Sequence, residues 1–230
     1  MNKKILFIIL IVVVITSAAT YAILQKTTPE TEQNINQVDA SDYISAHQEI
    51  STLPLENLTI KEKEALLIMR EEEKLARDVY LTLYDKWGVN IFRNIASSEQ
   101  THTDSVRYLI ERYDLTDPVT NESIGIFTNQ TFQDLYTSLV KQGEQSLVEA
   151  LKVGATIEDL DIKDLQEFIK ETDNEDIITI YENLLRGSRN HMRSFDKQLS
   201  KNGASYTAQY LEQAEINEIL AGSQEKGQNK

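Results

Sequence analysis

The chain has 230 residues, of which 40% are hydrophobic, and this is enough for one well-buried domain with appendages. It contains no cysteine, so disulfide frameworks, thiol nucleophiles, iron–sulfur clusters and cysteine-built zinc sites are excluded. The formal net charge of −14 argues against nucleic acid as a partner, because phosphate neutralisation needs a basic surface, and it favours cations. With only three prolines and eight glycines, the composition predicts an all-α fold.

Residues 1–25 have the pattern of a targeting segment. Lys3 and Lys4 precede the apolar run Ile5–Leu24, which is long enough as a helix to cross about 30 Å of hydrocarbon. It is either an uncleaved signal anchor or a signal peptide, since Ser17–Ala19 offers a small-residue cleavage pattern. In both cases the positive flank keeps the N-terminus in the cytoplasm. We therefore expect an extracytoplasmic protein, membrane-anchored if the segment stays and secreted if it is removed.

Residues 26–58 have the composition of a polar stalk, because they lack a sustained apolar period. The folded domain is expected to begin at Thr59, which has Glu62 three residues later in a capping-box pattern, and Gly88 is expected to end the first helix. The predicted long helices cover residues 59–87, 90–113, 144–171 and 173–200, with short helices over 132–141 and 208–220. The sequence thus predicts a domain over 59–202 and a tail over 203–230 with a short helix.

Apolar residues recur at alternating three- and four-residue steps in the four long helices, which is the spacing of a bundle seam. Each seam is polar near its middle, where an isolated carboxylate would be costly unless paired or metal-bound. At 1.5 Å per residue, these polar positions on the first two helices lie about 16–23 Å from the connection near Gly88. On the last two helices they lie about 18–27 Å from the connection near Asp173. We therefore expect one layer that contains Glu73, Glu99, His102, Glu158, Asp161 and His191. Four carboxylates and two imidazoles are the ligand inventory of a di-iron or di-manganese carboxylate bundle.

Two motifs on the first two helices carry a family resemblance. They are Glu73-x-x-Ala76-Arg77-x-x-Tyr80 and Phe92-x-x-Ile95-Ala96-x-x-Glu99-x-x-His102. Both resemble the iron-binding half of rubrerythrin and of the wider ferritin-like superfamily, and residues 153–162 and 186–191 resemble an uncharacterised prokaryotic family of the ferritin-like group. The resemblance covers about residues 60–200. It implies an antiparallel four-helix bundle of ferritin-like type with a long connection between the second and third helices.

The chain departs from this pattern at one position. The superfamily usually repeats Glu-x-x-His on the fourth helix, but here Ser188 stands three residues before His191. Asp161, one turn after Glu158, is the acid that spacing offers in its place, and a single-metal or empty centre stays open. Tyr80 lies one heptad beyond the first acid and is either a hydrogen-bond donor to a ligand carboxylate or an ordinary core aromatic.

The expected cofactor is iron, two ions per chain, with manganese as the alternative. The resemblance and the inventory predict Fe(II) oxidation or peroxide reduction, with metal ions and dioxygen or hydrogen peroxide as partners and a homodimer as the candidate assembly. Membrane contact is expected through the N-terminal segment only. The competing hypothesis is a non-enzymatic metal-binding or partner-binding helical protein with a vestigial site. Glu71, Glu72 and the acids of residues 171–176 are expected to be solvated.

Overall fold

The computed structural model describes residues 47, 48 and 50–226, so the predicted targeting segment and most of the predicted stalk lie outside the described residues. Within them the regular structure is entirely helical, which confirms the all-α class. The helices are α2 (Ile60–Trp87), α3 (Asn90–Arg112), α4 (Gln130–Gly143), α5 (Leu147–Lys170), α6 (Glu175–Lys201) and α7 (Gln213–Ala221). Among these helices, none combines the length and hydropathy that crossing a bilayer requires.

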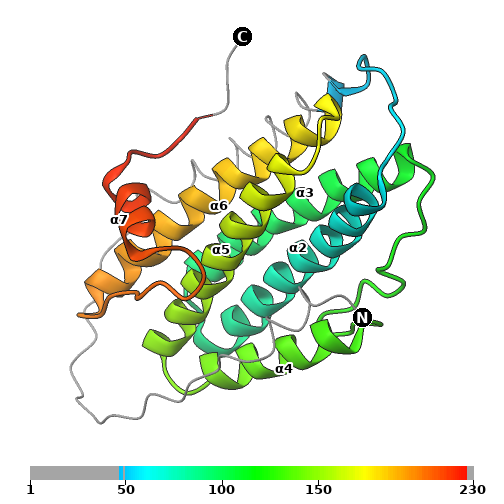
Figure 1. The fold of residues 1–230 in the computed structure, drawn as a ribbon. Helices are drawn as coiled ribbons and strands as arrows, with labels where there is room; N and C mark the ends of the chain where they lie inside the picture. The colour runs from blue at the N-terminus through cyan, green and yellow to red at the C-terminus, as the bar shows by residue number, and fades with distance from the viewer. Residues whose placement is uncertain (1–46, 49, 227–230) are drawn as a thin grey trace.

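The four long helices lie side by side as two hairpins (Figure 1). In the first hairpin α2 packs on α3, and in the second α5 packs on α6. The hairpins meet where α2 contacts α5 and α3 contacts α6. The shorter α4 packs across α2 and α5, and α7 packs on α6. The polar centre of each seam therefore lies where the two hairpins meet.

The ends of the helices follow local sequence signals. Thr59 and Glu62 form the predicted capping box, and Gly88 ends α2 in the left-handed conformation with φ of 64°. The helix α3 begins at Asn90, as predicted, and Val89 occupies the N-cap position without a side-chain hydrogen bond. The helix α5 starts three residues later than predicted because the Ser146 hydroxyl accepts a hydrogen bond from the Glu149 amide.

The apolar core consists of two clusters, one toward each end of the long helices. One cluster contains Leu83, Phe92 and Phe195 together with side chains from α4 and α7. The other contains Leu66 and Leu165, and it also includes Ile50 from the segment that was expected to be a polar stalk. The buried polar layer lies between the two clusters.

The outer face of α2 is also covered, which the sequence had not predicted. Glu71 and Glu72 were expected to be solvated but are only 5% and 7% exposed. The reason is that α4 and residues 114–129 pack over this face, where the Lys74 ammonium donates to the backbone carbonyls of Ser123 and Ile126. In the expected solvated run 171–176, Asp176 is buried and accepts hydrogen bonds from Arg112 and Tyr113.

The C-terminal segment is held against α5 by one carboxylate. Asp159, fully buried, accepts hydrogen bonds from the Tyr206 hydroxyl at 2.8 Å and from the backbone amides of residues 209, 210 and 211 at 2.7–3.0 Å. Farther along, Glu225 pairs with Arg189 and Arg193 of α6.

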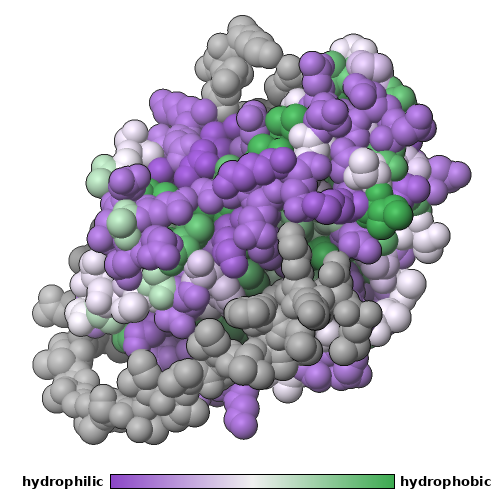
Figure 2. Space-filling model, viewed as in Figure 1, coloured by the Kyte–Doolittle hydropathy of each residue, from purple (hydrophilic) through white to green (hydrophobic). Residues whose placement is uncertain are grey.

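The face of the molecule seen in Figure 2 is mostly hydrophilic.

Candidate metal centre

Five of the six predicted ligands meet between the four long helices. Glu73 comes from α2, Glu99 and His102 from α3, Glu158 from α5 and His191 from α6. Each is at most 6% exposed. The three-residue spacing of Glu99 and His102 puts both side chains on the inner face of α3. Four separate helices therefore contribute to one buried group of carboxylates and imidazoles.

These residues form two triads that share one carboxylate. In the first triad, Nδ1 of His102 lies 2.8 Å from Oε2 of Glu99 and 3.3 Å from Oε2 of Glu73. In the second, Nδ1 of His191 lies 2.9 Å from Oε1 of Glu99 and 3.5 Å from Oε2 of Glu158. The two imidazole centroids are 5.6 Å apart. Glu99 thus presents one oxygen to each triad.

The polar atoms of the triads are better placed to bind a cation than to form hydrogen bonds with one another. Nδ1 of both histidines and Oε1 of Glu73 are buried without a hydrogen-bond partner, although carboxylate oxygens lie close to both nitrogens. In each triad one donor atom from every residue lies within 4.8 Å of the others. Carboxylate oxygens and an imidazole nitrogen that converge around one point match the ligand preference of iron and manganese.

Neighbouring residues fix the orientation of both imidazoles. Nε2 of His191 is 3.0 Å from the Ser98 hydroxyl, so its Nδ1 is turned toward the carboxylates. The ring of His102 packs directly on the backbone of α6 at Gly187, where a Cβ atom would lie 2.6 Å from the ring. The Tyr80 hydroxyl donates to Oε1 of Glu158 at 2.5 Å. Of the two roles that the sequence leaves open for Tyr80, the structure shows the hydrogen bond to a carboxylate of the second triad.

The centre retains protons when no metal is bound. Burial and the nearby Asp161 carboxylate raise the pKa of Glu73. Burial alone would lower the pKa of His102 and of His191, but the adjacent carboxylates outweigh it and raise both pKa values well above the ordinary value. Burial raises the pKa of Glu99, and the two histidines reverse this and hold it low. A bound cation would displace these protons, so affinity for metal should increase with pH.

Asp161, the sixth predicted ligand, lies outside both triads. Its carboxylate accepts a hydrogen bond from Ser188, the residue in the position where the superfamily pattern has an acid. Burial and the charges of Glu158 and Glu99 raise the pKa of Asp161 to about 8. Asp161 is thus hydrogen-bonded to α6 through Ser188 and is not a member of either triad.

Sequence reasoning missed two residues that shape the centre. Gly187 carried a signal, since a glycine inside a helix costs about 1 kcal/mol relative to alanine and therefore suggests a close approach. Ser98 carried none, because a serine beside Glu99 is common on a helix surface. Only the packing of α3 on α6 brings it to His191.

Comparison with known proteins finds a family model and a relative that each match most of this chain. Residues 62–223 match the family described as an uncharacterized protein domain, DUF2202. The uncharacterized protein MJ0754 of Methanocaldococcus jannaschii is 59% identical over 181 residues, which cover 79% of this chain and 98% of that protein. The crystal structure of the hypothetical protein MJ0754 aligns with a TM-score of 0.74 over 76% of this chain and 99% of the other. The chain therefore belongs to the DUF2202 family.

Proposed function

We propose that this protein is a ferritin-like four-helix bundle that holds two iron ions in a carboxylate and histidine centre. The observation that carries the proposal is the pair of triads, in which Glu99 is shared and both Nδ1 atoms lack a hydrogen-bond partner. Glu73, Glu99 and His102 would hold one ion, and Glu99, Glu158 and His191 the other. Manganese, which accepts similar ligands, is the alternative metal.

The reaction we propose is oxidation of Fe(II) with reduction of dioxygen or hydrogen peroxide. With peroxide, two Fe(II) ions would supply two electrons, and two protons would complete the reduction to two water molecules. The protein would hold the ions at a fixed spacing through Glu99 and exclude bulk water by burial. The Tyr80 hydroxyl would keep the Glu158 carboxylate in position. Since the chain has no cysteine, further electrons must come from an external donor.

Anaerobic metal loading tests this assignment. The purified full-length chain, kept in mild detergent, should bind about two Fe(II) or Mn(II) ions under anaerobic conditions. His102→Ala and Glu99→Gln should each lower this number, and the shared position of Glu99 makes its loss affect both ions. The matched control is His47→Ala, because the His47 ring packs at a tilt against Tyr108 and belongs to neither triad. Folded protein without bound transition metal would refute the proposal.

Variants at Asp161 and Ser188 distinguish a redox-active centre from one that only binds metal. If Asp161 serves the second ion, Asp161→Ala should leave one ion bound and abolish two-electron oxidation. Adding Ser188→Glu to this variant should restore part of the binding of the second ion. Both single variants must be measured alongside, because the effects of neighbouring substitutions are rarely additive. Two bound ions with no reaction toward dioxygen or peroxide would instead favour the non-enzymatic alternative.

We also propose that the domain acts outside the cytoplasmic membrane. The two lysines and the apolar run near the N-terminus support this location, and the run lies outside the described residues. Protease added to intact spheroplasts should digest the domain if it is tethered. A secreted form should be found in the medium. Full protection inside the spheroplasts would contradict the proposed topology.

A further inference from the structure

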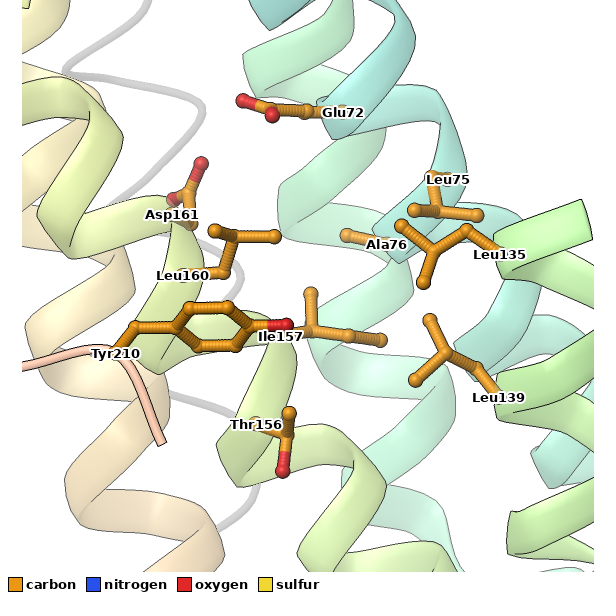
Figure 3. A pocket seen from close by; sticks show the side chains of 10 residues that line it. All are labelled: Glu72, Leu75, Ala76, Leu135, Leu139, Thr156, Ile157, Leu160, Asp161 and Tyr210. Carbon is orange, nitrogen blue, oxygen red and sulfur yellow. The ribbon is translucent and has the colours of Figure 1, made fainter. Parts of the chain in front are cut away.

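A cavity of about 30 Å³ lies between α2, α4, α5 and the C-terminal segment (Figure 3). Its wall combines leucines of α2 and α4 with side chains of α5, and apolar atoms form almost all of its surface. Figure 3 shows Leu135 and Leu139 on one side of the space and Leu160 and the ring of Tyr210 on the other. Four segments of the chain therefore enclose a space that none of their side chains fills.

The cavity extends inward from the surface of the protein. Its outer wall is formed by half-buried side chains, namely Leu135, Leu160 and Tyr210. The backbone amide of Tyr210 donates to Asp159 at 3.0 Å, so the ring is held over the cavity by the same carboxylate that anchors the C-terminal segment. The inner wall is formed by buried side chains such as Ala76 of α2.

This inner wall adjoins the two triads. Ala76 lies one turn after Glu73 on the same face of α2, and Ile157 directly precedes Glu158 on α5. Asp161 also lines the cavity, and burial together with the nearby Asp161 charge raises the pKa of Glu73. The cavity therefore lies next to ligands of both triads.

The size and chemistry of the cavity suit a small apolar molecule. The polar side chains in its wall contribute little of its surface, so water or hydrogen peroxide inside it would lose hydrogen bonds. Apolar cavities in proteins stay dry and take up apolar molecules such as xenon. One water-sized group needs about 10–15 Å³ of such space, so the cavity fits a molecule of two heavy atoms. Dioxygen is apolar and has two heavy atoms.

We propose that this space, the apolar cavity, binds dioxygen and is the route by which dioxygen reaches the two-metal centre. Dioxygen enters between the half-buried side chains of the outer wall, and the buried side chains Ala76 and Ile157 hold it next to the triads. The inference rests on the proposed function and deepens it, because it makes dioxygen rather than hydrogen peroxide the oxidant.

Dissolved dioxygen is paramagnetic and speeds the relaxation of nearby methyl protons, so dioxygen itself is the probe. The metal-free full-length chain, kept in mild detergent, is measured by methyl NMR under dioxygen and under nitrogen. The methyl groups of Leu75 and Ile157, which line the cavity, should relax faster under dioxygen than those of Leu66 and Leu165. The latter two are at least as deeply buried, but they belong to the other apolar cluster.

Two substitutions at Leu139 change the size of the cavity in opposite directions. Leu139→Phe should fill the space and remove the excess relaxation at Leu75 and Ile157, whereas Leu139→Ala should enlarge the space and increase it. Both substitutions lower stability, so opposite changes in relaxation separate cavity filling from destabilisation. Leu109→Phe is the matched control, because Leu109 lies in the other apolar cluster, and it should leave the excess unchanged.

With iron loaded, Leu139→Phe should slow Fe(II) oxidation by dioxygen and leave both the rate with hydrogen peroxide and the number of bound ions unchanged. An unchanged rate with dioxygen, or an equal fall with both oxidants, would refute the route.

The NMR measurement separates this inference from the proposed function, because it needs no metal. If Leu75 and Ile157 relax no faster than Leu66 and Leu165, dioxygen binding in the apolar cavity is refuted and the two-metal centre stands. If they relax faster but the folded protein binds no transition metal, dioxygen binding is supported and the proposed function is refuted.

Discussion

Replacing Gly187 by alanine should displace His102 from the candidate centre. A Cβ atom at this position would lie 2.6 Å from Cε1 and Nε2 of the ring, whereas ordinary contact begins at 3.4 Å. The imidazole would therefore have to move by the difference, about 0.8 Å. The ring is only 6% exposed, so the surrounding side chains restrict its movement. Its Nδ1 would leave the point on which Glu73 and Glu99 converge.

The shift is large compared with the tolerance of a metal site. Metal–nitrogen distances hold to about 0.2 Å, so a displacement several times larger weakens or breaks the bond. We expect binding of the first ion to fall about 10–100-fold, or about 1.4–2.8 kcal/mol. The metal-free protein should lose less. Overpacking costs about 1–3 kcal/mol, while alanine regains about 1 kcal/mol of helix propensity.

Titration with Mn²⁺ would measure the affinity, and thermal unfolding of the metal-free protein would measure the stability. Gly143→Ala is the matched control, since its Cβ would lie 2.6 Å from Leu83, a side chain of the apolar cluster. It should lower stability and leave Mn²⁺ affinity unchanged. If Gly187→Ala binds both ions as tightly as the wild type, His102 is not a ligand and the reasoning is wrong.

Three further predictions use other contacts. Tyr80→Phe removes the 2.5 Å hydrogen bond to Glu158 and should weaken metal binding by about tenfold, less than loss of a ligand, as a titration would show. The pKa of Asp161 is raised to about 8, so its contribution to the stability of the metal-free protein is complete below about pH 4 and is lost as pH rises through 8. The melting temperature of Asp161→Asn should therefore gain on the wild type across this range, and a constant difference would contradict the assignment. Asp159→Ala removes four hydrogen bonds, so limited proteolysis should cleave residues 204–225 faster while the long helices stay intact; equal cleavage rates would argue against this anchor.

The sequence determined the helices and the composition of the polar layer. The capping box at Thr59 and the glycine at position 88 set the ends of α2 through local backbone chemistry. Heptad spacing along α3 put Glu99 and His102 on the inward face, and rise per residue put the layers of the two hairpins at similar heights. These are short-range rules that act within one helix, so a single sequence suffices to apply them.

The tertiary structure decided which polar residues away from the seams are buried. Periodicity placed Glu72 outside the seam of α2, and the inference that it is solvated failed because α4, distant in sequence, packs over that face. Gly187 likewise matters only because α3 brings His102 against it, and Asp159 because the C-terminal segment returns to α5. A helical pattern identifies the face a helix buries in its own seam. Whether a second face is buried depends on contacts between segments far apart in the chain, which no local pattern encodes.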